Sequence, residues 1–216
     1  MLVLAVDTAT PAVTAGVVRL DGDAPRALAH RITVNPRAHA EVLTPHILAC
    51  LAESGHGPAD LDAVVVGVGP GPFTGLRVGM ATGAAFGDAL GIPVHGVCSL
   101  DAIAADAAAE DQRDLLVVTD ARRREVYWAR YQGGRRVEGP AVNRPVDLEP
   151  QPSVVVAGSA VHAELFDLPV VAVATPSPAG LVAVAAAALM AAVDPEPLVP
   201  LYLRRPDAVE MADRKK

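Results

Sequence analysis

The sequence GVGPGPFTGLRVG, residues 67–79, joins an apolar run to a long stretch of small residues. This pattern predicts a buried strand, a glycine-rich turn and a helix with Thr74 as its N-cap. Such turns often hold phosphates, but a Walker A loop requires a lysine, and the first lysine of this chain is Lys215. The dinucleotide pattern GxGxxG fails as well, because Pro72 stands where its third glycine should be. We therefore expect a strand-to-helix turn that defines the fold rather than a phosphate-binding loop.

Glycines recur at every fourth residue through the helix that follows this turn. They are Gly75, Gly79, Gly83, Gly87 and Gly91. Residues four apart share one face of a helix, and each glycine inside a helix costs about 1 kcal/mol relative to alanine. The stripe indicates that something approaches this backbone closely. Two neighbours are open at this point: the sheet or another helix of the same chain, or a partner subunit.

The composition is that of a globular protein with a core of small apolar residues. Of the 216 residues, 51% are hydrophobic and only 3% aromatic, and the net charge is -7. A protein that binds nucleic acid on its own is usually strongly basic, so the short arginine runs, residues 122–124 among them, are interpreted as solvated charges. Cys50 and Cys98 have no CxxC spacing, and neither a secretory signal nor a membrane-length apolar run is visible. The reducing cytoplasm is the expected compartment, without a membrane partner.

The order of the predicted elements begins with an antiparallel meander and then alternates helix and strand. Strands are expected at residues 2–9, 12–20, 27–34, 62–69, 92–97, 115–121, 125–132 and 153–159, and helices at 36–54, 74–90, 99–110 and 179–193. Asn35 is the predicted N-cap of the first helix, with Pro36 in its first turn. Residues 133–152 contain several prolines and glycines and are predicted as a loop.

This order, with a partial repeat in the second half, resembles the superfamily of actin, sugar kinases and Hsp70 (ASKHA). The resemblance implies an α/β fold with two lobes, in which mixed sheets carry flanking helices and the second lobe is reduced. Both halves begin with an apolar strand that ends in an acidic residue, at VDTA and VTDA. We expect a first lobe over residues 1–105, a reduced second lobe over 106–194 and an extended tail over 195–216.

Four motifs make the resemblance more specific: LAVDTAT, GVGPGPFTGLRVGMATGAAFG, DARRREVYWARY and YLRRPDAVE. Together they resemble the bacterial TsaB (YeaZ) family, with Pro72 where most members have serine. The resemblance implies a dimerisation subunit for threonylcarbamoyl modification of adenosine 37 in tRNA (t6A37). Such a subunit binds and activates a TsaD-like catalytic paralogue, works with a TsaE-like ATPase and meets tRNA through the complex. A homodimer of the isolated chain is left open.

The same resemblance implies that the subunit is not the catalyst. The catalytic relative carries an HHxxxH-like metal motif, and IPVHGVCSLDA, laid on it, keeps His95 but places Gly96 and Leu100 at two ligand positions. A protease is not supported either, because the GxSxG pattern is missing and Ser159 stands in AGSAV. Cys98 is expected to be a buried structural cysteine. We therefore expect no catalytic residues, no metal and no intrinsic cofactor.

Asp7, Thr8 and Asp120 stand where the phosphate loops of the superfamily contact nucleotide and metal. They are tentative nucleotide-binding residues, with ATP or ADP at the assembled complex. However, Ala9 occupies a position where a kinase would need glycine. The other interpretation is that the two aspartates only end hairpins and mark an inherited architecture. The alternative function is an ATP-dependent small-molecule kinase or carbamoyl-transfer enzyme of the same superfamily.

The resemblance also implies that the helices at residues 36–53 and 75–90 form the partner surface. Large apolar residues recur at helical spacing on both helices, and one stripe of each must face its own sheet. The remainder would form an exposed apolar patch. The candidate interface residues are His39, Leu43, Ile47, Leu76, Met80 and Gly83.

Overall fold

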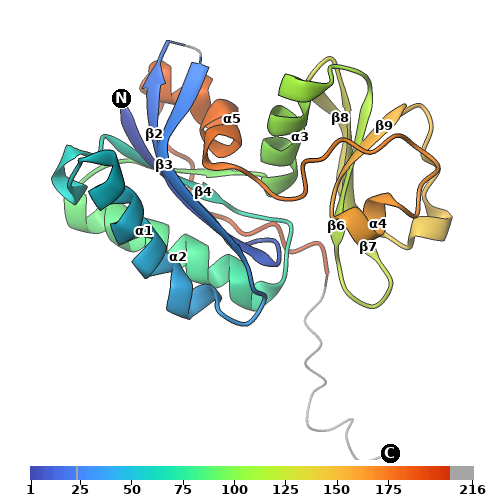
Figure 1. The fold of residues 1–216 in the computed structure, drawn as a ribbon, viewed down its shortest axis with the longest axis horizontal. Helices are drawn as coiled ribbons and strands as arrows, with labels where there is room; N and C mark the ends of the chain where they lie inside the picture. The colour runs from blue at the N-terminus through green and yellow to red at the C-terminus, as the bar shows by residue number, and fades with distance from the viewer. Residues whose placement is uncertain (23, 205–216) are drawn as a thin grey trace, which may run out of the picture.

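The computed structural model describes residues 1–22 and 24–204 and has two lobes, each built on a mixed β-sheet (Figure 1). The first sheet has the strand order β3-β2-β1-β4-β5 and the second has β8-β7-β6-β9. The second sheet therefore repeats the arrangement of the first four strands of the first sheet and lacks a counterpart of β5. The expected α/β fold, with two mixed sheets, flanking helices and a reduced second lobe, is confirmed.

The first sheet starts with the predicted antiparallel meander of β1 (Leu2–Asp7), β2 (Ala12–Asp21) and β3 (Ala24–Val34). Strands β4 (Ala63–Gly67) and β5 (Val94–Val97) extend it in parallel to β1. Every residue of β1 is buried, because helices cover both faces of the sheet. Alternate residues of β1 therefore belong to different cores, one beneath α1 and α2 and the other beneath α5.

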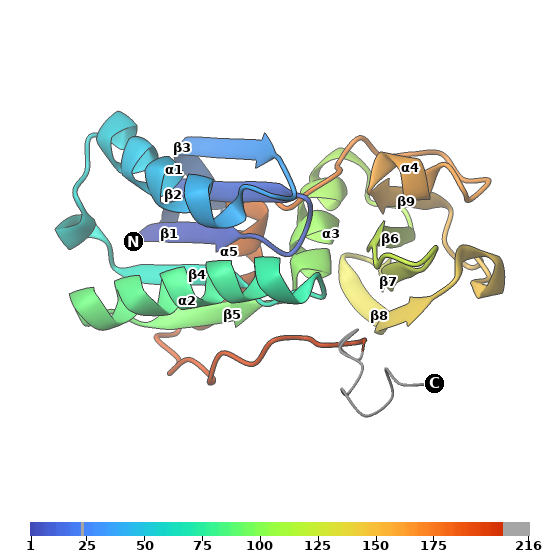
Figure 2. The same ribbon diagram turned by 90° about the horizontal axis from the view of Figure 1, so that it is seen from below.

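Helices α1 (His39–Ser54) and α2 (Phe73–Leu90) lie side by side on one face of the first sheet (Figure 2). Both predicted N-caps are wrong. Asn35 instead accepts a hydrogen bond from the backbone N–H of Arg37 at 3.1 Å, and this turn delays the start of α1 to His39. Helix α2 begins one residue before Thr74, after Pro72, without a side-chain cap.

The second sheet is built from β6 (Leu115–Asp120), β7 (Val126–Gln132), β8 (Arg135–Asn143) and β9 (Val155–Gly158). The short helix α4 (Ala160–Ala163) follows β9, and 3₁₀ turns lie at Pro58–Asp60 and Pro145–Asp147.

Strand β8 corrects the predicted loop over residues 133–152. It pairs antiparallel with β7 at the edge of the sheet, with two irregularities in register. The sequence of β8 did not predict a strand, because it is largely exposed and contains proline. An edge strand has little apolar alternation and tolerates proline.

Helix α3 (Ser99–Glu110) lies between the lobes, and α5 (Pro178–Met190) returns to the first sheet (Figure 1). The carboxylate of Asp106 in α3 accepts hydrogen bonds from the backbone N–H and the hydroxyl of Ser177, both at 2.7 Å. Ser177 in turn caps α5 by accepting from the N–H of Gly180 at 2.9 Å. The predicted division at residue 105 falls inside α3 and stays a prediction, while α5, from the predicted second lobe, packs on the first sheet.

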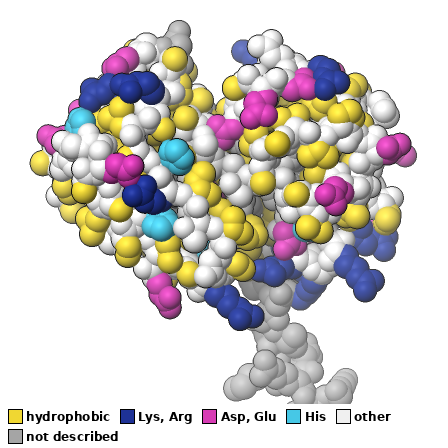
Figure 3. Space-filling view, in the orientation of Figure 1, with side chains coloured by type: hydrophobic (Ala, Val, Ile, Leu, Met, Phe, Trp, Pro, Cys, Tyr) yellow, Lys and Arg dark blue, Asp and Glu magenta, His cyan; other side chains and the backbone are white. Residues whose placement is uncertain are grey.

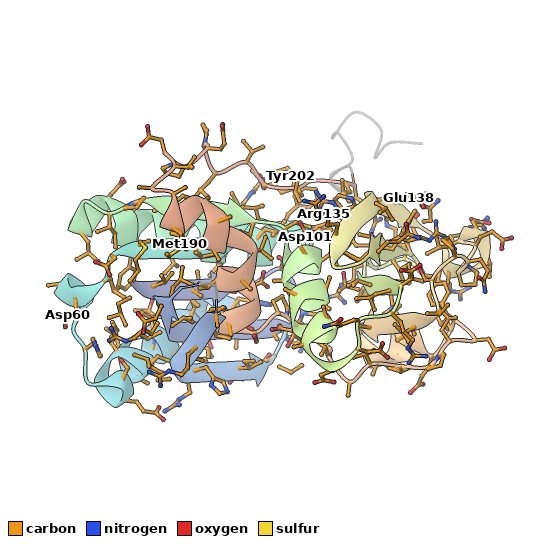
Figure 4. The ribbon with its side chains drawn as sticks, turned by 90° about the horizontal axis from the view of Figure 1, so that it is seen from above. Asp60, Asp101, Arg135, Glu138, Met190 and Tyr202 are labelled. Carbon is orange, nitrogen blue, oxygen red and sulfur yellow. The ribbon has the colours of Figure 1, made fainter. Side chains whose placement is uncertain are left out.

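Residues after α5 run as an extended strap from the first lobe to the second (Figure 2). The backbone N–H of Leu201 donates to the carbonyl of Val68 at 2.9 Å. The Tyr202 ring packs on Phe73 with 4.6 Å between centroids, and Arg77 Nε donates to its hydroxyl at 3.0 Å. Figure 4 shows Tyr202 at the junction of the lobes. Residues 205–216 of the predicted tail lie outside the described residues.

Candidate functional site

The glycine-rich turn fits tightly against the end of β1. A Cβ atom on Gly71 would lie 2.1 Å from the carbonyl oxygen of Ala9, and one on Gly67 would lie 1.7 Å from Asp7 Oδ2. Both glycines are therefore required by the close approach of the chain to itself. The interpretation as a strand-to-helix turn that defines the fold is supported, because the turn packs directly on the end of β1.

Asp7 is fully buried beneath this turn. Its carboxylate accepts a hydrogen bond from the hydroxyl of Ser99, at the start of α3, and another from the backbone N–H of Ala9 at 2.9 Å. Burial raises the pKa of Asp7 to about 6, although these hydrogen bonds and nearby His39 oppose the rise. The contact with Ser99 joins β1 to the helix between the lobes, and no sequence motif had pointed to Ser99.

Thr8 is buried as well and binds the first turns of α2. Its hydroxyl donates to the carbonyl of Gly75 at 2.7 Å and accepts from the N–H of Gly79 at 3.0 Å. A Cβ atom on Gly79 would lie 2.4 Å from this oxygen. These two glycines of the stripe therefore allow a threonine side chain to reach the helix backbone.

The tentative nucleotide assignment needs correcting for Asp7 and Thr8. Both side chains are buried, Thr8 against α2 and Asp7 against Ser99, so neither is exposed to the junction of the lobes. Asp120 is different, because it lies partly exposed at the junction of the lobes and accepts a hydrogen bond from the N–H of Arg122 at 2.7 Å.

Two adjoining cavities occupy this junction. The larger, of about 280 Å³, is lined by Thr10, Arg37, His39, Thr74, Asp120 and Arg122 among others. The smaller, of about 170 Å³, shares Asp120 and Arg122 and is closed by Phe73, Tyr127 and Arg204. His39 Nε2 donates to the carbonyl of Thr10 at 3.0 Å, which fixes its ring at the edge of the larger cavity. For Asp120, nucleotide contact stays a prediction.

A second polar cluster, which the sequence did not reveal, joins Ser159, His162 and Asp120. Ser159 Oγ lies 2.8 Å from His162 Nδ1, while His162 Nε2 lies 3.7 Å from Asp120 Oδ1. The second distance is too long for a hydrogen bond, so the aspartate does not orient the ring as in a hydrolase triad. The backbone N–H of Ser159 is also engaged, with the carbonyl of Val118 at 2.9 Å. The cluster lies where β6 and β9 end, at the same junction as Asp120.

The positions laid on the metal motif are structural. His95 and Leu100 are buried, and a Cβ atom on Gly96 would meet Val68 at 2.8 Å. Within residues 1–22 and 24–204, no group of three or more metal-binding side chains lies close enough to share an ion. Cys98 is buried as predicted, and burial raises the pKa of its thiol to about 12. No described helix is long and apolar enough to cross a membrane.

The helix pair α1–α2 turns most of its predicted interface residues inward. Leu43, Ile47 and Leu76 are buried in the core beneath the helices, and a Cβ atom on Gly83 would lie 2.3 Å from Val66 Cγ2 of the sheet. This corrects their assignment to a partner surface and shows that the close neighbour of the glycine stripe is the chain's own sheet. His39 and Met80 are half-buried.

The outer face of the pair carries other residues of the same helices. On α1, Leu48 is 53% exposed and Thr44, one turn earlier, is exposed as well. On α2, Ala81 and Ala85 are exposed. Sequence periodicity had found the helices but not the stripe that faces outward, because both stripes contain apolar residues.

Comparisons with known proteins agree with this architecture. The family model described as TsaD, tRNA N6-adenosine threonylcarbamoyltransferase, matches residues 31–196. An uncharacterized protein of Mycobacterium tuberculosis (strain H37Rv) is 62% identical over 97% of this chain and 95% of its own length. The tRNA threonylcarbamoyladenosine biosynthesis protein TsaB of Escherichia coli is 39% identical over 61% of this chain and 55% of its own.

A solved structure covers nearly the whole chain. It is a Pseudomonas aeruginosa protein described as similar to peptidase YeaZ, with 31% identity and a TM-score of 0.78 over 94% of this chain and 99% of its own. The fold and the packing at the end of β1 define a two-lobed α/β protein in which Thr8 bonds directly to the backbone of α2. The chain belongs to the TsaB (YeaZ) family, whose named members act in tRNA threonylcarbamoyladenosine biosynthesis.

Proposed function

We propose that this chain is a non-catalytic subunit that binds and activates a TsaD-like catalytic subunit in the synthesis of t6A37. The observation that carries the proposal is the filled position at the end of β1. There, Asp7 accepts a hydrogen bond from Ser99 and Thr8 bonds to the backbone of α2, so both side chains are engaged within the protein. A protein that has converted this position into packing acts through its surfaces.

The surface offered for binding is the outer face of α1 and α2. Small side chains at Ala81 and Ala85 allow a partner helix to approach closely, and Leu48 supplies a large apolar contact. The family model that matches this chain is described as a tRNA N6-adenosine threonylcarbamoyltransferase. A catalytic paralogue with the same helix pair could dock with pseudo-twofold symmetry, face to face.

The proposal extends to ligands and to the third subunit. The isolated chain holds no ATP, ADP or metal of its own, and nucleotide enters with the assembled complex and its TsaE-like ATPase. The kinase alternative has no support from the structure at Asp7 and Thr8, since neither side chain is accessible to a phosphate.

Reconstitution from purified subunits tests the proposal. The chain, the TsaD-like subunit and the TsaE-like ATPase are combined in all pairings with an unmodified tRNA transcript, ATP and a threonylcarbamoyl donor. Nucleoside mass spectrometry then follows t6A37. We expect no product from this chain alone and a much higher rate when it joins the other two. Product from the chain alone, or a rate of the other two that does not change when it is added, would contradict the proposal.

A further inference from the structure

Six arginines line one edge of the molecule and cross from the first lobe to the second. We call them the arginine row, and its members are Arg37, Arg122, Arg123, Arg124, Arg144 and Arg204. Figure 3 shows Lys and Arg side chains gathered along this lower edge on both sides of the junction. Arg37 and Arg122 line one cavity, Arg122 and Arg204 the next, and Arg124 and Arg144 a groove of about 570 Å³. Arg122, Arg123 and Arg124 are consecutive in the chain and connect the two cavities to the groove.

The centre of the row is an unusual turn between β6 and β7. Arg122, Arg123 and Arg124 have φ angles of 63°, 52° and 62°, so all three are in the left-handed region. This region costs roughly 1–2 kcal/mol for each residue that has a side chain. The turn is held by the N–H of Glu125, which donates to the carbonyl of Arg122 at 2.9 Å, and by Asp120. Strained backbone that the surrounding structure maintains is typical of functional sites.

Carboxylates offset only part of this charge. Asp120 lies 3.7 Å from Arg122, Glu125 lies 3.3 Å from Arg204, and Asp147 pairs with Arg144 at 2.7 Å. No carboxylate among residues 1–22 and 24–204 pairs with Arg37 or Arg124. The row is a local excess of positive charge on a chain whose net charge is -7.

The exposure of the row suits an extended polyanion. The side chains of Arg122 and Arg144 are 61% and 63% exposed, whereas Arg204 is 13% exposed and ties the strap to the turn through the carbonyl of Ala121. Guanidinium groups bind phosphate with paired hydrogen bonds. A line of such groups along an edge matches a phosphodiester backbone better than a compact acidic patch on a protein.

We propose that the arginine row binds the phosphate backbone of the tRNA substrate, with the left-handed turn at residues 122–124 as its central contact. This inference rests on the proposed function for its substrate. The row passes the start of α1 at Arg37, whereas the outer face of α1 and α2 is the proposed surface for the catalytic subunit. Both partners can therefore be bound at once.

The experiment measures binding of an unmodified tRNA transcript to the full chain, alone and with the TsaD-like subunit, over a series of salt concentrations. One variant carries Arg122→Gly, Arg123→Gly and Arg124→Gly, because glycine adopts this backbone without strain. A second carries lysine at the same three positions and keeps the charge. A matched control replaces Arg26, Arg113 and Arg135 with glutamine and removes the same amount of charge. These arginines lie at or just before the starts of β3, β6 and β8, whereas the arginine row lies beyond the ends of these strands (Figure 4 labels Arg135).

The glycine variant should lose about tenfold or more in tRNA affinity at roughly 0.1 M salt. Its plot of log affinity against log salt should be flatter by about two, since each phosphate contact contributes about 0.7–0.9 to the slope. The lysine variant should keep most of the slope, and the control should match the wild type.

Three results would overturn the inference. The first is unchanged tRNA affinity and salt slope in the glycine variant, and the second is an equal loss of tRNA affinity in the matched control. The third is a glycine variant that no longer binds the TsaD-like subunit but still binds tRNA as well as the wild type. The last would make the row a protein contact. Failure of the wild-type chain to bind the TsaD-like subunit would instead contradict the proposed function. In that case, comparing tRNA binding by the wild-type chain alone with binding by the glycine variant alone would still decide the inference.

Discussion

At the scale of single residues, two side chains at the end of β1 determine how the first lobe closes. Thr8 bonds to the backbone of α2 and Asp7 to the hydroxyl of Ser99, so β1 is tied to both helices that follow the glycine-rich turn. The polar atoms of both side chains are satisfied within the protein, so the hydrogen bonds at this position contribute to the stability of the fold.

The buried carboxyl of Asp7 should make stability depend on pH. Its pKa is about 6 in the folded protein against 3.8 ordinarily, so the folded state binds the proton more tightly than the unfolded chain does. The resulting stabilisation is complete below about pH 4 and is lost as the pH rises through 6, and the difference is about 3 kcal/mol.

Urea unfolding of the wild type and of Asp7→Asn at pH 4, 5, 6 and 7 would measure this effect. Asparagine is nearly isosteric and does not titrate, and its single amide oxygen keeps one of the two acceptors that serve Ser99 and Ala9, a loss that is the same at every pH. Between pH 4 and 7 the wild type should lose about 2.5 kcal/mol more than the variant, since the unfolded carboxyl is already partly ionised at pH 4. Parallel pH profiles for the two proteins would show that Asp7 does not titrate in this range.

At the scale of elements, sequence reasoning found most helices and strands but not their environment. The glycine spacing predicted a close neighbour for α2, yet only the structure shows that Val66 and Thr8 are that neighbour. Local patterns could not tell which stripe of α1 or α2 faces the sheet, because that depends on residues distant in sequence. Ser99 and the edge strand β8 were missed for the same reason, since their roles come from tertiary contacts.

Gly83 tests the orientation of α2. A leucine there would drive its Cβ to within 2.3 Å of Val66 Cγ2 and should lower the free energy of unfolding by about 2–3 kcal/mol. Ala81→Leu, two residues earlier on the exposed face, should change it by no more than about 0.5 kcal/mol. Urea unfolding monitored by circular dichroism compares the two. Equal stability of both variants would mean that the glycine stripe does not pack on the sheet.

At the scale of the whole molecule, the two lobes are joined by α3, by the return of α5 and by the strap that ends at Arg204. These three connections hold the cavities at the junction in one arrangement. The outer face of α1 and α2 lies on the first lobe, whereas the arginine row crosses from the first lobe to the second. Such a molecule is suited to placing a catalytic subunit relative to tRNA.

The family could be inferred from sequence because motifs such as DARRREVYWARY are long and specific, and the partner remains a proposal that follows from the family. The interface could not, since four of its six predicted residues are core. The corrected surface makes a sharper test possible. Leu48 on α1 and Val137 on β8 are 53% and 54% exposed, so they form a matched pair on different lobes.

The most direct measurement is isothermal titration of the TsaD-like subunit with the wild-type chain, Leu48→Glu and Val137→Glu, each first checked for folding by circular dichroism. The proposed interface predicts a 1:1 complex for the wild type and Val137→Glu. A charge buried against an apolar contact should weaken binding by Leu48→Glu by about 2 kcal/mol or more, which is at least a twentyfold loss. Equal affinity of all three proteins would place the interface elsewhere, and no binding by the folded wild type would contradict the central claim that this chain acts as the partner of a catalytic subunit.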